Sequence, residues 1–301
     1  MNRRFFIPLD PLATLRAHGA DADTFLQGQL SNDLRALTPE RGQFSSFNSA
    51  KGRMLAIFHL LRDGSDVLLE LPDEIADITL KRLRMFVLRA AVTLENISPQ
   101  YAAIGLIGSA ADDQLAQLQL PVPSQPMDCI RDHARGITVF RRHGQTPRFS
   151  LHAPRAVLTA LMPLLGEPAP YCAWQRAQIE AGEPVIYNAT RDHFVPQMAN
   201  LDQLGGISFD KGCYTGQEIV ARLHYLGQIK RRLYLCSSEG ARPPPGAEVL
   251  CAGAVIGEVV DAVDTSAGTL FSAVLQTTFA ERTDLHLADT RAVQVRKAPG
   301  T

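Results

Sequence analysis

The chain has 301 residues, enough for about two domains of ordinary size. Its residues are 46% hydrophobic and 20% charged, a composition that supports a buried core and excludes a generally disordered chain. The 30 basic and 31 acidic residues leave a formal net charge of −1. This balance argues against a dedicated nucleic-acid-binding protein, which usually carries a basic surplus.

Helices and strands alternate in the first half of the chain. Apolar residues recur at helical spacing in four segments, 21–34, 74–88, 112–118 and 155–165. Strands are expected at 44–51, 54–61, 67–71, 92–97 and 101–107, with hairpin turns at Gly52, at Asp63-Gly64 and at Arg135-Gly136. The alternation predicts an α+β unit from about residue 42 to residue 165.

The composition changes after Gly166. Residues 167–170 (Glu-Pro-Ala-Pro) read as a connector, and three consecutive prolines at 243–245 mark a second break. Short β-like runs lie at 248–250, 255–260, 270–275 and 292–295, separated by Gly, Asp and Thr. They predict a small all-β C-terminal domain.

Two features of the sequence indicate the cellular compartment of the protein. The apolar stretch at the N-terminus stops at Pro8, and the longest apolar stretch, 156–165, contains Pro163, so we expect neither a secretion signal nor a membrane span. The five cysteines are an odd number without a Cys-x-x-Cys pair, which favours neither a disulfide framework nor a zinc site. We therefore expect reduced thiols, a cytoplasmic location and no bound metal.

The densest motif runs from Lys211 to Arg222 (KGCYTGQEIVAR). Thr215-x-x-Glu218 predicts a capping box at the start of a helix, and Glu218 and Arg222 are spaced as an i,i+4 ion pair. Cys213 precedes this helix and lies two residues from Lys211, and both features would lower the pKa of its thiol. Cys213 is therefore a candidate reactive thiol; the alternative is a buried structural cysteine beside an ordinary helix cap.

Further motif segments stand at residues 19–29, 48–53 (NSAKGR), 179–184 (IEAGEP) and 195–201 (VPQMANL), and GGISF at 205–209 precedes the Lys211 motif. In this order they resemble the YgfZ family, which is a family of folate-binding proteins related to the aminomethyltransferase of the glycine cleavage system. The resemblance extends from Gly19 to Tyr234. It implies a role in maintaining iron–sulfur enzymes, including those that thiolate tRNA.

The resemblance also implies a fold. It predicts an α+β protein of the aminomethyltransferase type: a three-domain ring around a central folate channel, with a ferredoxin-like middle domain and a small C-terminal domain of β-barrel type. We accordingly expect a discontinuous folate-binding domain at 1–41 and 166–232, an α+β domain at 42–165, and a C-terminal β domain at 233–301.

The resemblance implies roles for individual residues at the positions where the motifs match. Trp174, the only tryptophan, stands where the family places an indole that stacks on folate, although a lone tryptophan is otherwise a core residue. Glu180 matches the acid that grips the pterin in the related transferases; its alternative role is a surface partner of Arg176. The other expected ligand contacts are Asn48, Lys51, Lys211, Tyr214, Gln217, Glu218 and Arg222. In this scheme an indole, an acid and the Cys213 thiol share one cleft.

One departure from the family pattern concerns catalysis. The aminomethyltransferases carry an Asp pair after their Gly-rich turn, whereas this chain has Leu55 and Ala56 there. Aliphatic side chains cannot transfer a proton, so the one-carbon step lacks its acid–base group. The family's second aromatic residue is also missing, since Leu12 stands in its place. We therefore do not expect a standard enzyme.

These observations predict a folate-binding accessory protein that supports the assembly or repair of iron–sulfur enzymes and, through them, tRNA thiolation. The expected ligand is tetrahydrofolate or a derivative, and the expected partners are iron–sulfur enzymes or assembly proteins, bound transiently by a monomer. One alternative is a folate-dependent aminomethyl or methyl transferase. Another is a direct tRNA-binding module, which the net charge disfavours.

Overall fold

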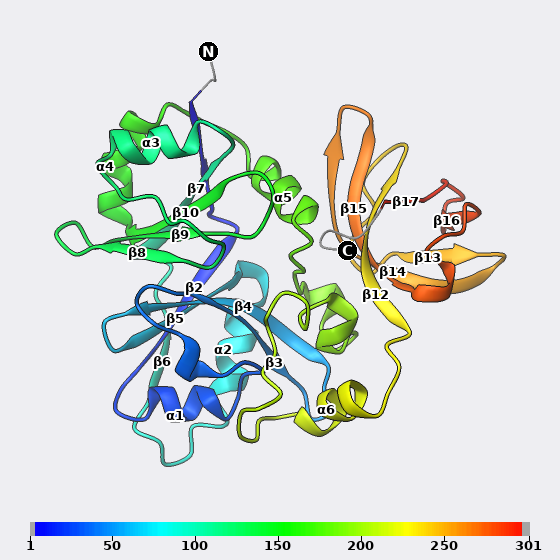
Figure 1. The fold of residues 1–301 in the computed structure, drawn as a ribbon, viewed down its shortest axis with the longest axis horizontal. Coiled ribbons are helices and arrows are strands. Elements are labelled where there is room, and N and C mark those ends of the chain that lie inside the picture. The colour runs from blue at the N-terminus through cyan, green and yellow to red at the C-terminus, as the bar shows by residue number, and fades with distance from the viewer. Residues whose placement is uncertain (1–3, 297–301) are drawn as a thin grey trace.

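A computed structural model describes residues 4–296, which form three sheets with helices packed on them (Figure 1). The first sheet has five strands in the order β3-β4-β5-β2-β6, and every pairing in it is antiparallel. Its strands are β2 (Leu12–His18), β3 (Gln43–Asn48), β4 (Met54–Asp63), β5 (Asp66–Pro72) and β6 (Thr93–Asn96). The helices α1 (Ala22–Gln27) and α2 (Ala76–Arg84) belong to the same part of the chain.

The second sheet has the strand order β11-β1-β7-β10-β9-β8. Its strands are β1 (Phe5–Pro8), β7 (Tyr101–Ile107), β8 (Cys129–Asp132), β9 (Ile137–Arg141), β10 (Arg148–Pro154) and β11 (Glu167–Pro168). The helices α3 (Ala111–Gln117) and α4 (Arg155–Leu165) bury Leu115, Leu158 and Leu161 in the same core as Phe149 and Leu151 of β10.

The third sheet has the order β16-β13-β14-β15-β12-β17 and forms the C-terminal part of the molecule (Figure 1). Its strands are β12 (Arg231–Ser238), β13 (Glu248–Cys251), β14 (Ala254–Thr265), β15 (Gly268–Gln276), β16 (Leu285–Leu287) and β17 (Gln294–Arg296). The helix α5 (Tyr171–Glu180) lies between this sheet and the second one, and α6 (Gln217–Tyr225) precedes β12.

The sheets do not follow the boundary expected between residues 41 and 42. The first sheet pairs β2, which lies before that boundary, with β5 and β6, which lie after it. The second sheet takes β1 from the N-terminus together with β7 to β10. The chain thus passes from one sheet to the other between residues 8 and 12, and again between residues 96 and 101. The expected 42–165 unit is divided between two sheets.

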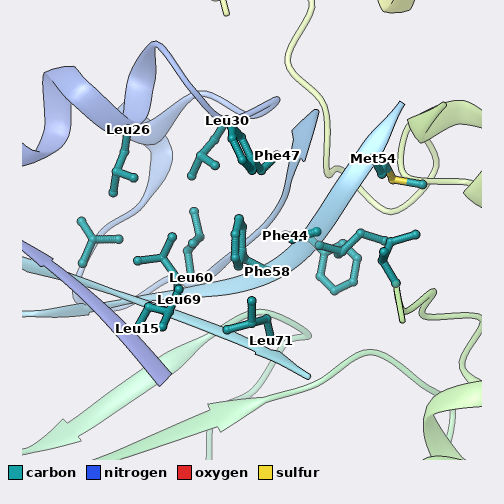
Figure 2. Packing of buried hydrophobic residues seen from close by; sticks show 14 of the residues in the cluster. Leu15, Leu26, Leu30, Phe44, Phe47, Met54, Phe58, Leu60, Leu69 and Leu71 are labelled. Carbon is teal, nitrogen blue, oxygen red and sulfur yellow. The ribbon is translucent and has the colours of Figure 1, made fainter. Parts of the chain in front are cut away.

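The largest core covers the first sheet. Leu26 and Leu30, from α1 and the turn after it, point onto Phe58 and Leu60 (Figure 2). Each large apolar side chain buried in this way contributes about 1.5–3 kcal/mol of transfer free energy. Ile186, Phe194, Ala199, Leu201 and Val220 belong to the same core. The segment between α5 and α6 is therefore fixed against the strands that carry the Asn48–Arg53 motif.

None of the helices within residues 4–296 combines the length and the apolar character needed to cross a membrane.

Candidate functional site

Two of the sequence motifs meet in space. The turn at residues 49–52, between β3 and β4, packs against the loop that begins α6. Gly216 has φ +81°, and a Cβ added there would overlap the carbonyl oxygen of Ser49; a Cβ on Gly52 (φ +68°) would lie 2.8 Å from Cβ of Ile219. Both positions require glycine, because only a residue without a Cβ allows these two loops to approach so closely.

Cys213 lies at this junction and is exposed, so the structure places it on the surface and not in the core. It lines a shallow hollow of about 620 Å³ together with Ala50, Tyr214, Gln217 and Glu218. Gln217 fixes the loop, because its Oε1 accepts a hydrogen bond of 3.2 Å from the amide of Tyr214. Residues of the 49–52 turn and of the loop before α6 thus surround the exposed thiol together.

The start of α6 differs from the predicted capping box. The N-cap is Gly216 in a left-handed conformation, and no side chain caps the helix. Thr215 therefore lies one residue too early to act as the N-cap. The tight packing against Ser49 and Gly52 determines where the helix begins and outweighs the local capping preference. Within residues 4–296, Glu218 and Arg222 also form no ion pair with each other; both are exposed.

Lys211 has a structural role that the sequence did not reveal. Its ammonium group donates hydrogen bonds to the carbonyl oxygens of Gln27 (2.6 Å), Leu30 (2.6 Å) and Asn32 (2.9 Å). An ammonium group has three N–H donors, so all three are used. Burial lowers the pKa of Lys211 to about 8. This lysine ties the Cys213 loop to the turn after α1 and is not available to a ligand, contrary to the prediction.

The remaining predicted contacts near the junction differ in exposure. Lys51 and Arg222 are exposed, whereas Tyr214 is buried, with the Lys211 ammonium 5.0 Å from its ring centroid. Asn48 is 1% exposed, and neither of its amide atoms has a hydrogen-bond partner among the described residues. The structure thus brings Asn48, Lys51, Tyr214 and the α6 residues to one junction.

A second hollow lies on the other side of the 49–52 turn. Its volume is about 440 Å³, and it is lined by Ser49, Leu55, Ile78, Lys81, Arg82, Met85, Arg191 and Asp192. Leu55, Ile78 and Met85 supply an apolar surface. Ser49 donates a hydrogen bond of 2.6 Å to Asp192, and Arg191 donates one of 3.2 Å to the carbonyl oxygen of Leu55. Because Ser49 lines this hollow and Ala50 lines the Cys213 hollow, a single turn separates the two.

Trp174 lies elsewhere and is enclosed. It is 1% exposed and packs with Ile7 of β1 and with Leu9, which follows that strand. A Cβ on Gly105 would overlap its indole, and the guanidinium of Arg148 lies 4.9 Å from the ring centroid. The indole therefore presents no open face for a stacked ligand, in contrast to the sequence prediction.

Glu180 is also separate from Cys213. It is half exposed, pairs with Arg176 at 2.9 Å, and lines a cleft of about 410 Å³ between α5 and the third sheet. Six residues along a helix turn the direction of a side chain by roughly 240°, so Trp174 and Glu180 occupy different faces of α5. The structure does not bring the indole, this acid and the thiol into one cleft, and the prediction of a single cleft is wrong.

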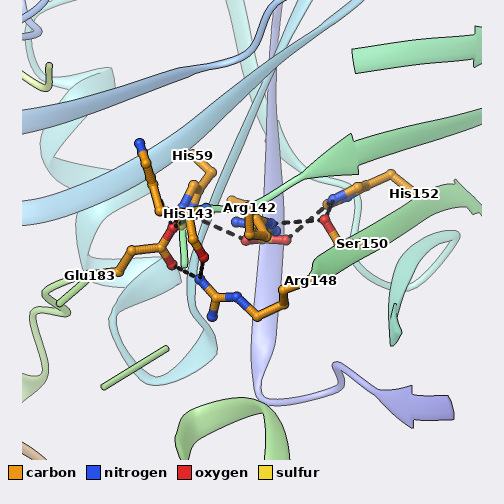
Figure 3. A network of polar contacts seen from close by, with 8 residues as sticks. His59, Arg142, His143, Arg148, Ser150, His152 and Glu183 are labelled. Atoms are coloured by element: carbon orange, nitrogen blue, oxygen red, sulfur yellow. Dashed lines mark hydrogen bonds and ion pairs between the residues drawn. The ribbon is translucent and has the colours of Figure 1, made fainter. Parts of the chain in front are cut away.

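The sequence interpretation missed a buried group that we call the polar hub (Figure 3). It consists of His59, Glu70, Arg142, His143, Arg148, Ser150, His152 and Glu183. Arg148, Ser150 and His152 alternate along β10, and this period of two is the signal that could have found the hub, because it places three polar side chains on one face of an otherwise apolar strand.

Two ion pairs hold the hub together. Arg148 binds Glu183, and Arg142 binds Glu70 at 2.6 Å and Ser150 at 2.9 Å. Burial alone would raise the pKa of Glu183, but the charge of Arg148, a hydrogen bond with His143 and the nearby ring of His59 hold it well below its ordinary value. Burial lowers the pKa of His59 to about 4. The hub thus contains ionised Glu183 and neutral His59, and it joins the first sheet to the second.

Comparisons with known proteins agree with this architecture. The chain is 32% identical over 240 residues to the tRNA-modifying protein YgfZ of Colwellia psychrerythraea, which covers 79% of this chain and 73% of the relative. It is also 32% identical over 247 residues to the protein of that name from an Escherichia coli strain, covering 81% and 75%. No protein-family profile matches. The fold resembles the crystal structure of the glycine cleavage system aminomethyltransferase T from Bartonella henselae, with a TM-score of 0.80, 16% identity, and coverage of 99% and 86%.

Proposed function

Because the chain belongs to the YgfZ family, we propose that it acts in tRNA modification, by binding a reduced folate and supporting the iron–sulfur enzymes that thiolate tRNA. The observation that carries the proposal is the identity of 32% over about four fifths of the chain. The exposed thiol of Cys213 supports a direct role for it toward a client protein.

The hollow at Leu55 is the place that we propose for folate. Leu55 stands where the resemblance puts the residue that faces the folate nitrogen in the transferases. The apolar surface of Leu55, Ile78 and Met85 suits a flat ring system, and the exposed Lys81 and Arg82 suit the carboxylates of a glutamate tail. Neither cation has an ion-pair partner within residues 4–296, whereas Arg176 in the cleft at Glu180 is already paired.

An aminomethyl or methyl transferase is a second candidate function, and one observation favours it. Leu55 and Ala56 provide no acid or base, but Asp192 places a carboxylate on the wall of the same hollow. That carboxylate accepts a hydrogen bond of 2.6 Å from Ser49, which fixes its position on the wall. Turnover of methylene-tetrahydrofolate with an amine acceptor, lost in Asp192→Asn, would establish this function. Binding without turnover supports the accessory role.

The test is a calorimetric titration of the full chain with tetrahydrofolate. We expect saturable binding, weakened about tenfold or more by the double variant Lys81→Glu/Arg82→Glu, because two attractive charges become repulsive near the ligand tail. Lys230→Glu changes another exposed lysine, which does not line this hollow, and should bind like the wild type. Absence of binding at millimolar ligand contradicts folate binding; unchanged affinity in the double variant contradicts this location.

A further inference from the structure

The outward face of α6 carries large apolar side chains that are exposed. Nine such side chains are exposed within residues 4–296, and three of them lie between residues 219 and 226. They are Ile219 (41% exposed), Tyr225 (62%) and Leu226 (84%). Single exposed apolar residues are ordinary, whereas a cluster on one element marks an interaction surface. The fold itself gives this cluster no role.

Helical spacing places these side chains on one face. Ile219, Arg222 and Leu226 are spaced i, i+3 and i+7. The amide of Leu226 donates to the carbonyl oxygen of Arg222 at 3.0 Å, so Leu226 continues the helical turn. Val220 is buried and fixes the other side of the helix on the core of the first sheet. This is the spacing with which a helix inserts its side chains into the groove of a partner. We call Ile219, Arg222, Tyr225 and Leu226 the α6 face.

Two other rings hold Tyr225 in place. The ring of His224 stacks on that of Phe209, with centroids 3.7 Å apart and an interplanar angle of 13°. The ring of Tyr225 meets both at a steep angle, with centroid distances of 4.7 Å to His224 and 6.2 Å to Phe209. A side chain that is already ordered loses little conformational freedom on binding. Tyr225 is therefore a preorganised anchor.

The α6 face continues into the Cys213 hollow. Glu218 and Ala221 line that hollow, and Arg222 and Tyr225 each lie four residues further along the same helix. Residues four apart on a helix are neighbours on its surface. A partner seated on the α6 face would therefore lie beside the exposed thiol.

Charge on this segment favours an acidic partner. Residues 219–231 carry three cations, Arg222, Lys230 and Arg231, and no acid. None of the three has an ion-pair partner within residues 4–296. Lys51, in the adjoining turn, is exposed as well, and Glu218, at the end of α6 next to the hollow, is the single acid of that helix. The local surplus is positive on a chain whose formal net charge is −1.

We infer that the α6 face docks a protein partner whose surface offers an apolar groove bordered by carboxylates. Ile219, Tyr225 and Leu226 are the apolar anchors, and Arg222 pairs with a carboxylate at the edge of the groove. An RNA backbone offers no groove for aliphatic anchors, and a second copy of this chain would bring the same cations together. The inference rests on the proposed function for the identity of the partner, which is an iron–sulfur enzyme that thiolates tRNA.

The test is a calorimetric titration of the full chain with a purified iron–sulfur enzyme that thiolates tRNA. We expect saturable binding that Leu226→Asp weakens about tenfold or more, because a charge replaces an apolar anchor and faces carboxylates. Arg222→Glu should weaken binding and make it less sensitive to salt. Leu164→Asp changes an exposed leucine of α4, in another part of the molecule (Figure 1), and should bind like the wild type. Urea denaturation checks that the exposed substitutions leave the fold intact.

Absence of saturable binding by the wild type, or equal affinity of Leu226→Asp, overturns the inference. Two further outcomes would also overturn it. In one, bare tRNA binds the chain and Leu226→Asp weakens that binding, which makes the face an RNA surface. In the other, the wild type sediments as a dimer and Leu226→Asp as a monomer, which makes the face a contact between copies.

Thiolation of tRNA in cells that lack their own YgfZ protein separates this inference from the proposed function. We expect the wild type and Leu164→Asp to restore thiolation and Leu226→Asp to fail. If Leu226→Asp restores it fully, the docking face is wrong and the proposed function stands. If the wild type restores none, the proposed function is wrong, and the calorimetric result decides the docking face separately.

Discussion

At the scale of single residues, the spatial neighbours of a side chain determine its role, which the residue type alone does not. Lys211 belongs to the most recognisable motif and was predicted to contact a ligand, but its three donors are used by backbone carbonyls. Glu180 was predicted to grip a pterin and is a half-exposed partner of Arg176. The buried acid Glu183 lies three residues further on. A motif identifies a segment, but spatial neighbours determine what each side chain binds.

Replacing Lys211 by Met should destabilise the fold strongly. The substitution keeps the length of the side chain and leaves three carbonyl oxygens without their donor, at a cost of about 1–3 kcal/mol for each group that stays buried. We expect the free energy of unfolding to fall by about 3 kcal/mol or more in urea denaturation. Lys51→Met, at the exposed turn, is the control and should change it by less than about 0.5 kcal/mol. Equal effects would show that the three bonds contribute little.

Glu183 and Glu180 form a second matched pair. Glu183→Gln leaves Arg148 buried without a counter-charge, and loss of one partner of a buried ion pair costs about 3–5 kcal/mol. Glu180→Gln removes an exposed pair that is worth at most about 1 kcal/mol. Thermal and urea unfolding of the two variants should differ accordingly. A stable Glu183→Gln protein would mean that the hub does not join the two sheets energetically.

At the scale of elements, helical periodicity was a good guide where a helix lies on a sheet. The predicted helix at 155–165 is α4 with the same bounds, and those at 74–88 and 112–118 correspond to α2 and α3. The predicted helix at 21–34 is shorter, since α1 ends at Gln27 and Leu30 forms a β-bridge with Phe47. Contacts with distant strands determined the end of α1 and the start of α6, and local sequence cannot reveal such contacts.

The contact between the 49–52 turn and α6 can be tested with glycine substitutions. In Gly216→Ala, the backbone has a positive φ and the new Cβ would overlap the carbonyl oxygen of Ser49. The free energy of unfolding should therefore fall by about 3 kcal/mol or more. Gly253→Ala has a similar φ of +77° but no atom within 4 Å of the new Cβ, so it should cost only about 1–2 kcal/mol. Chemical denaturation measures both. A similar loss in the two variants would show that the close approach at Gly216 is easily relaxed.

At the scale of the whole molecule, local pattern indicated the fold class, and the resemblance predicted the specific fold. Alternating helices and strands indicated an α+β protein, and the short runs after residue 243 indicated a β-rich C-terminal part, which the third sheet provides. The division of strands between the first and second sheets was not predictable. Pairing such as β2 with β6 joins residues about eighty positions apart, and neither strand carries a local signal for its partner.

The junction between α5 and the third sheet should respond to pH. Asp261 of β14 accepts hydrogen bonds from Gln175 (2.7 Å) and from the amide of Ala262 (2.9 Å), and burial raises its pKa to about 6 from 3.8. Because the folded state holds this proton more tightly, the stabilisation is complete below about pH 4 and is lost as the pH rises through 6. Asp261→Asn mimics the protonated form.

Urea unfolding between pH 4 and pH 7 measures this effect. Asp261→Asn should match the wild type at pH 4 and exceed its free energy of unfolding by up to about 3 kcal/mol at pH 7. Asp113→Asn, on the exposed face of α3, should follow the wild type throughout. If Asp261→Asn and the wild type differ by the same amount at every pH, the carboxyl group does not titrate in this range.

The central proposal joins the exposed thiol of Cys213 to tRNA thiolation. The most direct measurement is the amount of thiolated nucleosides in tRNA from cells that lack their own YgfZ protein and express this chain or its variants. The wild type and Cys172→Ala, which removes the other exposed cysteine, should restore thiolation, whereas Cys213→Ala should fold normally and fail. Full restoration by Cys213→Ala would contradict a role for this thiol.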